Sequence, residues 1–373
     1  MLRSQELVSP QPRFPEEPGR FAIVGSGWRT EFFLRIAAAA PRWFSVVGVA
    51  ARNTARREYL ETTWRVPCFS TLDDLLSATQ PEFVVTAVSW EASPDFIEAI
   101  VRHGLPVLAE TPPAPDVDGL RALWSAVGGS GLVQVAEQYT RMPAHQARIA
   151  TIREGIIGEP TSAEISSTHL YHAVSLIRHY LDVGFAPVEV RAHTTVTPLA
   201  DPLRRDGWTG DETPHPTTTT YAWLDFHGKF GIYDFTDNQW WNPLRARRIV
   251  VRGSRGEWVD DTVTRLADPR TPVTSHLVRR RTGIDLNLEG MELDHISVDG
   301  SVRYRNRFFG SRFSEDDLAV AEILADMTAW VRGEAPPPYP LAEACHDHAV
   351  GCAIVEAART GGVVTVADEL WQG

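Results

Sequence analysis

Short apolar runs and helical patterns alternate along the first 140 residues of the chain. Each apolar run is four to seven residues long and is bounded by polar residues, Gly or Pro, which is typical of buried strands. The predicted strands are 21–24, 45–51, 83–88, 106–109 and 132–136, and the helices between them are 28–40, 55–64, 94–103 and 117–127. This alternation predicts a doubly wound parallel sheet, so we expect an α/β fold with an N-terminal Rossmann domain.

The pattern changes after about residue 150, where alternating apolar and polar positions predict a large, mainly antiparallel open sheet. The predicted strands are 161–168, 188–197, 217–226, 229–236 and 249–252, and the predicted helices are 172–181, 316–332 and 341–359. Segment 198–216 is rich in Pro, Gly, Asp and Thr and is predicted to be a long loop near the substrate. We expect three parts, namely a flexible arm over 1–19, a dinucleotide-binding Rossmann domain over 20–145, and an α+β domain for substrate binding and oligomerisation over 146–373.

Composition and charge narrow the class of protein. The net charge of −12 argues against general binding to nucleic acid or to an anionic membrane surface. No apolar stretch reaches the roughly 20 residues of a membrane span, and the N-terminus lacks the apolar region of a secretory signal. Three cysteines do not make a disulfide framework. We therefore expect a cytoplasmic protein in a reducing compartment.

The turn after the first strand has the composition of a phosphate-binding loop. Gly25 and Gly27 flank Ser26 at the start of a predicted helix, and Thr30 replaces the third glycine of the dinucleotide fingerprint. Glycine lets backbone N–H groups approach a phosphate closely, although an ordinary strand-to-helix turn uses the same residues. Ligands of doubly wound sheets bind at the carboxyl ends of the strands. The predicted cofactor-binding residues at these ends are Gly25, Ser26, Gly27, Trp28, Arg29, Arg52, Asn53, Val88, Ser89, Ser93, Glu110 and Pro112.

The end of the second strand bears on the choice of dinucleotide. An NAD site usually has Asp or Glu there, about 20 residues after the glycines, to bind the ribose hydroxyls. This chain has Arg52 and Asn53 instead. Because Arg binds phosphate bidentately, the sequence favours the 2′-phosphate of NADP(H), with NAD(H) as the other candidate. The alternative is that Arg52 is an ordinary solvated surface arginine.

Two motifs and the order of the elements carry a family resemblance. Glu110-Thr111-Pro112 follows the predicted strand 106–109, and a Gly-Ile-Ile-Gly-Glu-Pro run at 155–160 precedes a new strand. In these features residues 20–365 resemble the glucose-fructose oxidoreductase/inositol dehydrogenase (Gfo/Idh/MocA) family. The resemblance implies a Rossmann domain and a second domain whose open sheet often mediates oligomerisation, here as a homodimer or homotetramer. It also implies hydride transfer between a nicotinamide and a carbon of a sugar, cyclitol or related polyol.

The chain departs from that family at two catalytic positions. Family members usually have Lys where this chain has Thr111, and many have Asp-x-Gly-x-His where it has Thr168-His169-Leu170-Tyr171-His172. His172 keeps the family position, and its ordinary pKa of about 6.5 suits a general acid or base. The resemblance thus implies His172, Tyr171, Thr111 and Glu110 as catalytic residues, with Glu137 as another possible carboxylate. The alternative is that His172 is a structural histidine at a helix start.

Other side chains have competing interpretations. Trp240 and Trp241, together with His169, are predicted to bind substrate by stacking on a sugar-like ring, but core or interface packing explains the tryptophans equally well. Cys345, His348 and Cys352 share one predicted helix, where they are better explained as a stripe facing the core than as a metal site. We therefore expect no metal cofactor.

Two functions follow from these features. The first is an NAD(P)-dependent oxidoreductase acting on a CH–OH group of a small polyhydroxylated molecule, with an atypical active site. The second is a nucleotide-binding partner or sensor protein that uses the same scaffold without catalysis, which the absence of the family Lys and Asp motivates.

Overall fold

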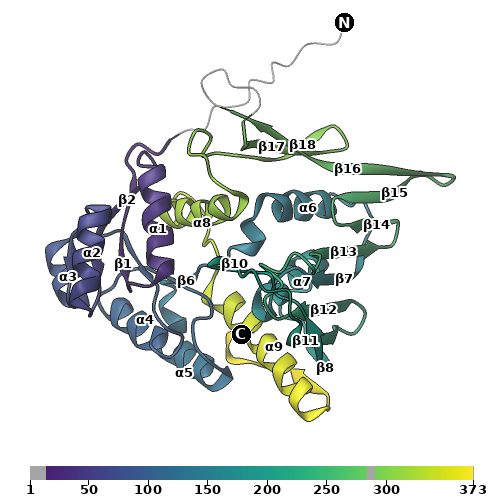
Figure 1. Ribbon diagram of the computed structural model, residues 1–373, viewed down its shortest axis with the longest axis horizontal. Coiled ribbons are helices and arrows are strands. Elements are labelled where there is room, and N and C mark those ends of the chain that lie inside the picture. Colours follow the sequence, from purple (N-terminus) through teal and green to yellow (C-terminus); the bar gives the residue numbers. More distant parts are fainter. Residues whose placement is uncertain (1–13, 284–289, 373) are drawn as a thin grey trace, which may run out of the picture.

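The computed structural model of the protein describes residues 14–283 and 290–372, which form two sheets with their covering helices (Figure 1). The first sheet has six parallel strands in the order β3-β2-β1-β4-β5-β6, which is the dinucleotide-binding order. Its strands are β1 (Gly19–Val24), β2 (Phe44–Ala50), β3 (Cys68–Phe69), β4 (Phe83–Thr86), β5 (Val107–Ala109) and β6 (Val133–Val135). Its helices are α1 (Trp28–Ala39), α2 (Thr54–Trp64), α3 (Leu72–Ala78), α4 (Ser93–Arg102) and α5 (Val117–Val127), followed by the short helix η1 (Gly128–Ser130). The predicted Rossmann domain is confirmed.

Local sequence explains where these elements begin. Thr71 caps α3 by accepting a hydrogen bond from the Asp74 backbone, and Asp116 caps α5 in the same way. The central strands β1 and β4 are covered on both faces, so Phe21 and Phe83 are fully buried and stack on each other at 5.3 Å. Continuous apolar runs of this kind predict parallel strands well.

The second sheet has eleven strands in the order β18-β17-β16-β15-β14-β13-β7-β12-β11-β8-β19. They are β7 (Pro160–Ser166), β8 (Val188–Leu199), β11 (His215–Asp225), β12 (Phe230–Thr236), β13 (Arg248–Gly253), β14 (Gly256–Val259), β15 (Thr262–Asp268), β16 (Thr271–Thr282), β17 (Glu292–Val298), β18 (Ser301–Arg305) and β19 (Val364–Val366). All pairs are antiparallel except β7 with β12. The five predicted strands are present, and the large antiparallel sheet is confirmed.

Helices cover one face of this sheet, as Figure 1 shows. They are α6 (Pro143–Arg153), α7 (Leu170–Leu181), α8 (Glu315–Val331) and α9 (Leu341–Thr360), with the short helices η2 (Tyr139–Arg141) and η3 (Leu370–Gln372). Cys345 on α9 is fully buried and His348 is 6% exposed, which agrees with a stripe facing the core, whereas Cys352, the third predicted member, is half-buried. Among the described residues no helix is long and apolar enough to cross a membrane.

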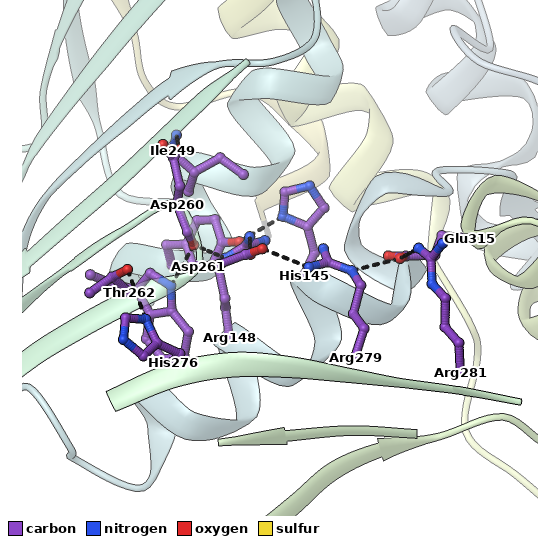
Figure 2. A network of polar contacts seen from close by, with 12 residues as sticks. His145, Arg148, Ile249, Asp260, Asp261, Thr262, His276, Arg279, Arg281 and Glu315 are labelled. Atoms are coloured by element: carbon purple, nitrogen blue, oxygen red, sulfur yellow. Dashed lines mark hydrogen bonds and ion pairs between the residues drawn. The ribbon is translucent and has the colours of Figure 1, made fainter. Parts of the chain in front are cut away.

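A buried polar network attaches α6 to the second sheet (Figure 2). Arg148 on α6 is 4% exposed and donates to the Asp260 carbonyl and, at 2.8 Å, to the Asp261 carboxylate. Arg279 of β16 binds the same carboxylate at 2.6 Å and reaches Glu315 of α8 at 2.7 Å. The Asp261 carboxylate therefore links α6 to β16.

The segment predicted as the loop 198–216 is more ordered than expected. Strand β8 continues to Leu199, β11 begins at His215, and a hairpin of β9 (Leu203–Arg204) and β10 (Gly207–Trp208) lies between them. Gly207 has a φ of +113°, which the turn of this hairpin requires. Composition predicted the turn residues but not this short pairing.

The two sheets are joined by more than the chain between them. Arg35 of α1 pairs with Asp317 of α8 at 2.7 Å, and the Val135 backbone donates to the Tyr339 carbonyl. Of the predicted arm, residues 1–13 lie outside the described residues, whereas Phe14 packs on Trp43 at 5.7 Å. The C-terminal helices therefore return to the first domain and fix its position.

Candidate active site

The glycine turn after β1 is shaped for close approach. Gly25 has a φ of +129°, and a Cβ there would lie 2.1 Å from the Ala87 carbonyl oxygen. Gly27 is the N-cap of α1, makes no side-chain cap, and has open space where its Cβ would be. The first N–H groups of α1 therefore face an open space, as a phosphate-binding helix N-terminus requires.

A cavity of about 520 Å³ opens over this turn, which is within the size range of cofactor sites. Ten of the twelve predicted cofactor-binding residues line it: Gly25, Ser26, Gly27, Trp28, Arg29, Arg52, Asn53, Val88, Ser89 and Glu110. The other two do not. Ser93 is only 3% exposed at the start of α4, and Pro112 is buried behind Thr111.

The arginines after β2 have different positions. Arg52 is exposed at the cavity, whereas the Arg56 side chain donates to the Ser26 carbonyl at 2.7 Å and Arg57 donates to the Ala51 carbonyl at 2.7 Å. Asn53 caps α2 by accepting a hydrogen bond from the Arg56 backbone. Arg52 is thus the cation placed to meet a ligand at the end of the second strand, and its neighbours support the backbone.

Glu110 is the carboxylate that lines this cavity, and it is already paired. Arg29 donates to it at 2.6 Å and to the Gln138 side-chain oxygen at 2.5 Å. Gln138 in turn donates to Asp316 of α8 at 2.5 Å. This chain of contacts fixes the Glu110 carboxylate beside the cofactor cavity, with Arg29 as its partner.

His172 has a carboxylate partner of its own. Its Nδ1 lies 2.6 Å from the Glu137 Oε2, and Glu137 follows β6 directly. The His172 side chain keeps 11% of its surface exposed and Glu137 only 2%, so His172 is the member that a substrate can reach. Burial raises the pKa of Glu137 to about 8 and lowers the pKa of His172. Both shifts favour a pair that holds one proton and carries no net charge.

The backbone before His172 is strained in a way that matches the family motif. Leu170 has a φ of +35°, in the region that favours glycine, and it stands at the glycine position of Asp-x-Gly-x-His. Its N–H donates to the Tyr233 hydroxyl at 3.2 Å. The strained turn therefore holds the start of α7 and directs His172 toward Glu137.

The other predicted catalytic residues gather around His172. The rings of Tyr171 and His172 are 4.4 Å apart, and Thr111 lies close enough to Tyr171 to act on the pKa of its hydroxyl. Burial raises the pKa of Tyr171, so its phenol stays protonated at neutral pH. Glu110 lies close enough to His172 for its charge to raise the pKa of the imidazole, against the larger effect of burial. These side chains belong to one site at the junction of β5, β6 and α7.

A second cavity of about 470 Å³ adjoins this cluster. It is lined by His169 and Trp240, whose rings meet edge to face at 4.8 Å, and by Phe235. Trp241 does not line it and is 44% exposed. Two of the three predicted substrate-binding residues are therefore brought together, and the third is not.

Sequence reasoning missed several residues of the site. Tyr139 packs on His172 at 4.5 Å, and Gln138 and Asp316 complete the contacts of Arg29. Asp316 comes from a helix 178 residues after Gln138, and no local motif signals that contact. Across the described parts of the chain, no group of three His, Cys, Asp or Glu side chains is arranged to hold a metal ion.

Comparisons with known proteins agree with this geometry. Residues 19–138 match the family model described as oxidoreductase family, NAD-binding Rossmann fold (GFO_IDH_MocA). The search of curated proteins found no match.

Solved structures are similar over almost the whole chain. A putative myo-inositol dehydrogenase from Sinorhizobium meliloti 1021 has a TM-score of 0.66 and 18% identity, over 93% of this chain and 99% of that one. Levoglucosan dehydrogenase in complex with NADH and levoglucosan has a TM-score of 0.67 and 17% identity, over 94% and 100%. A putative NADPH-dependent oxidoreductase from Desulfitobacterium hafniense DCB-2 has a TM-score of 0.65 and 15% identity, over 94% and 98%.

These likenesses establish a shared fold, and the family model locates the shared domain. Over residues 19–138 the chain matches the model of the NAD-binding Rossmann domain of the Gfo/Idh/MocA oxidoreductase family.

Proposed function

We propose that the protein is a nicotinamide-dependent oxidoreductase that acts on a CH–OH group of a small polyhydroxylated molecule, such as a sugar or cyclitol. The observation that carries this proposal is the His172–Glu137 pair at 2.6 Å. It lies beside Tyr171, whose ring is 4.4 Å from that of His172, and Thr111 lies near Tyr171 at the edge of the cofactor cavity. A proton-transfer group next to a dinucleotide site is what such a reaction needs.

The residues at the glycine turn fit a dinucleotide. The uncapped N-terminus of α1 supplies N–H donors, and Gly27 leaves open the space that a Cβ would fill, while Gly25 lets the Ala87 backbone approach the turn. The nicotinamide, when bound, supplies the hydride acceptor or donor. We infer a preference for NADP(H), because Arg52 lines the cavity and its one lining carboxylate, Glu110, is paired with Arg29.

The chain's own residues supply proton transfer, orientation of the catalytic side chain and contacts to the substrate. His172 takes up the substrate hydroxyl proton during oxidation and returns it during reduction, through the ring nitrogen that does not face Glu137. Glu137 orients the imidazole from its buried side. Tyr171 and Thr111 offer hydroxyls that orient the substrate where the family lysine is missing. His169, Trp240 and Phe235 supply ring faces and edges for the carbon skeleton.

The direct test is turnover of NADP⁺ and NAD⁺ with a panel of sugars, cyclitols and their acids. His172→Gln should lower kcat by roughly 10²–10⁴-fold while leaving NADPH binding and the melting temperature nearly unchanged. His179→Gln is the matched control, because His179 lies two turns later on α7 and bonds to the Ser175 carbonyl. Full activity in His172→Gln would remove His172 from the mechanism.

The alternative is a non-catalytic nucleotide-binding protein, motivated by Thr111 and Thr168 in place of the family Lys and Asp. This alternative predicts that the protein binds a dinucleotide but turns over none of the sugars, cyclitols or acids in the panel. Turnover that depends on His172 would contradict it.

We further propose that the face of the eleven-stranded sheet opposite α7 and α9 joins copies of this chain. On β11 the buried Ala222 and Leu224 alternate with Tyr221 and Trp223, which are 40% and 46% exposed. Val278 on β16 is 54% exposed. Exposed apolar residues spread over one sheet face favour an interface with a second copy. Neither nucleic acid nor a membrane is expected as a partner, because the chain is acidic.

A further inference from the structure

The β9–β10 hairpin belongs to the second domain, but its turn contacts Trp28, a residue that lines the cofactor cavity of the first. It is held at its base by Asn238, whose side-chain amide donates to Asp201 at 2.6 Å, and by the Thr209 backbone, which donates to the Pro202 carbonyl. The turn between its strands consists of Arg205 and Asp206. A hairpin fixed at its base presents its turn residues in a defined place.

The turn residue Arg205 meets the first residue of α1. Its guanidinium carbon lies 4.1 Å from the ring centroid of Trp28, which is a cation–π contact between the two domains. Trp28 is 56% exposed and lines the cofactor cavity immediately after the N-cap Gly27. The arginine is therefore stacked at the place where the α1 N-terminus opens into the cavity.

Other arginines near this turn are engaged by carboxylates. Arg29 pairs with Glu110, and Arg56 pairs with Glu31. On the hairpin itself, Arg204 pairs with Asp201 at 3.2 Å. Arg205 instead stacks on the face of the Trp28 ring. Stacking orients a guanidinium and leaves its N–H donors available to an anion.

We propose that Arg205 is a cofactor-binding residue that the second domain contributes, and that its guanidinium pairs with the pyrophosphate of the dinucleotide. This inference rests on the proposed function. In Rossmann domains the pyrophosphate lies at the N-terminus of the first helix, which here begins at Trp28. A helix N-terminus supplies partial charge and N–H donors, and Arg205 adds a full positive charge with a bidentate fork on the solvent side.

The arrangement also makes cofactor binding a joint property of the two domains. The glycine turn holds the pyrophosphate from the first domain, and the hairpin covers it from the second. Trp28 keeps the guanidinium extended over the cavity mouth, so less side-chain freedom is lost when the anion binds. A substitution in the second domain, far in sequence from the glycines, should therefore weaken binding of the dinucleotide.

The test measures binding rather than turnover. ADP-ribose, which keeps the pyrophosphate and lacks the nicotinamide, is titrated by calorimetry into the full-length protein, and NADPH is titrated by fluorescence. Arg205→Ala should raise the Kd for both by roughly three- to tenfold, as expected for one charge-assisted contact near the surface. Arg204→Ala is the matched control and should leave both Kd values within about twofold, because Arg204 faces Asp201.

Arg205→Lys should recover part of the affinity, since it keeps the charge and loses the planar fork. Equal Kd values for wild type and Arg205→Ala would overturn the inference and leave the proposed function intact. A raised Kd for NADPH with an unchanged Kd for ADP-ribose would also overturn the inference, because the arginine would then contact a part of the cofactor other than the pyrophosphate. If wild-type protein binds neither compound, the proposed function itself fails.

Discussion

At the scale of single residues, the His172–Glu137 pair sets the chemistry of the site. Its two members are buried, touch at 2.6 Å, and have opposite pKa shifts that both favour uncharged forms. In the proposed mechanism a substrate hydroxyl would meet His172 rather than Glu137, because the His172 side chain is 11% exposed and that of Glu137 is 2% exposed. The carboxylate therefore acts through the imidazole, as a positioning residue that also sets the pH at which the pair loses its proton.

This pair predicts a pH dependence. Burial raises the pKa of Glu137 to about 8, so the pair keeps its proton at pH 7 and loses it as the pH rises. Oxidation needs the pair in its deprotonated form as a base, so kcat/KM for alcohol oxidation should rise through about pH 8 in the wild type. Glu137→Gln removes the titrating carboxyl, and the burial-lowered pKa of His172 then moves the rise to lower pH. A pH–rate profile with an unchanged inflection in Glu137→Gln would contradict this role.

The sequence predicted one member of this pair through family position and left the other as one possible carboxylate. His172 stands at a motif position, whereas Glu137 pairs with it across 35 residues of chain and three elements, η2, α6 and β7. Leu170 shows the same limit. A leucine gives no sign in the sequence that its φ will be positive, and only the glycine at this position of the family motif suggests it. The place of Thr111 in the fold followed from the sequence, because it is the second residue after β5, a strand with a clear apolar pattern.

At the scale of elements, how well the sequence predicted a strand depended on its surroundings. The parallel strands of the first sheet are buried on both faces and read as apolar runs. Strands β15 and β16 are mostly Thr, Arg and Pro, with much of their length exposed, and no apolar period identifies them. The β9–β10 hairpin has two residues per strand, which is too short for any period to appear.

The open face of the second sheet leads to a prediction about assembly. If that face joins copies of the chain, Trp223→Glu should place a charge in the interface and lower the mass found by light scattering to that of a monomer. Trp208→Glu is the control, because Trp208 is 75% exposed on the hairpin rather than on the sheet. A wild-type monomer, or an unchanged mass in Trp223→Glu, would contradict the interface.

At the scale of the whole molecule, the site exists because the C-terminal part returns to the Rossmann domain. Asp316 of α8 supports Gln138, and the hairpin turn stacks on Trp28. The βα alternation and the late helices predicted two domains, and the family resemblance predicted their roles. No pattern in the sequence gave these interdomain contacts, because each joins residues more than 170 positions apart.

The central claim is that the cavity over the glycine turn binds a nicotinamide dinucleotide. The most direct measurement is a titration of the purified protein with NADPH and NADH, followed by nicotinamide fluorescence at one stated salt concentration. We predict saturable binding of NADPH with NADH at least about tenfold weaker, a difference of about 1.4 kcal/mol, because Arg52 stands where a ribose-binding carboxylate would be. Binding of NADH alone would contradict the assignment of Arg52. Binding of neither compound would contradict the oxidoreductase itself.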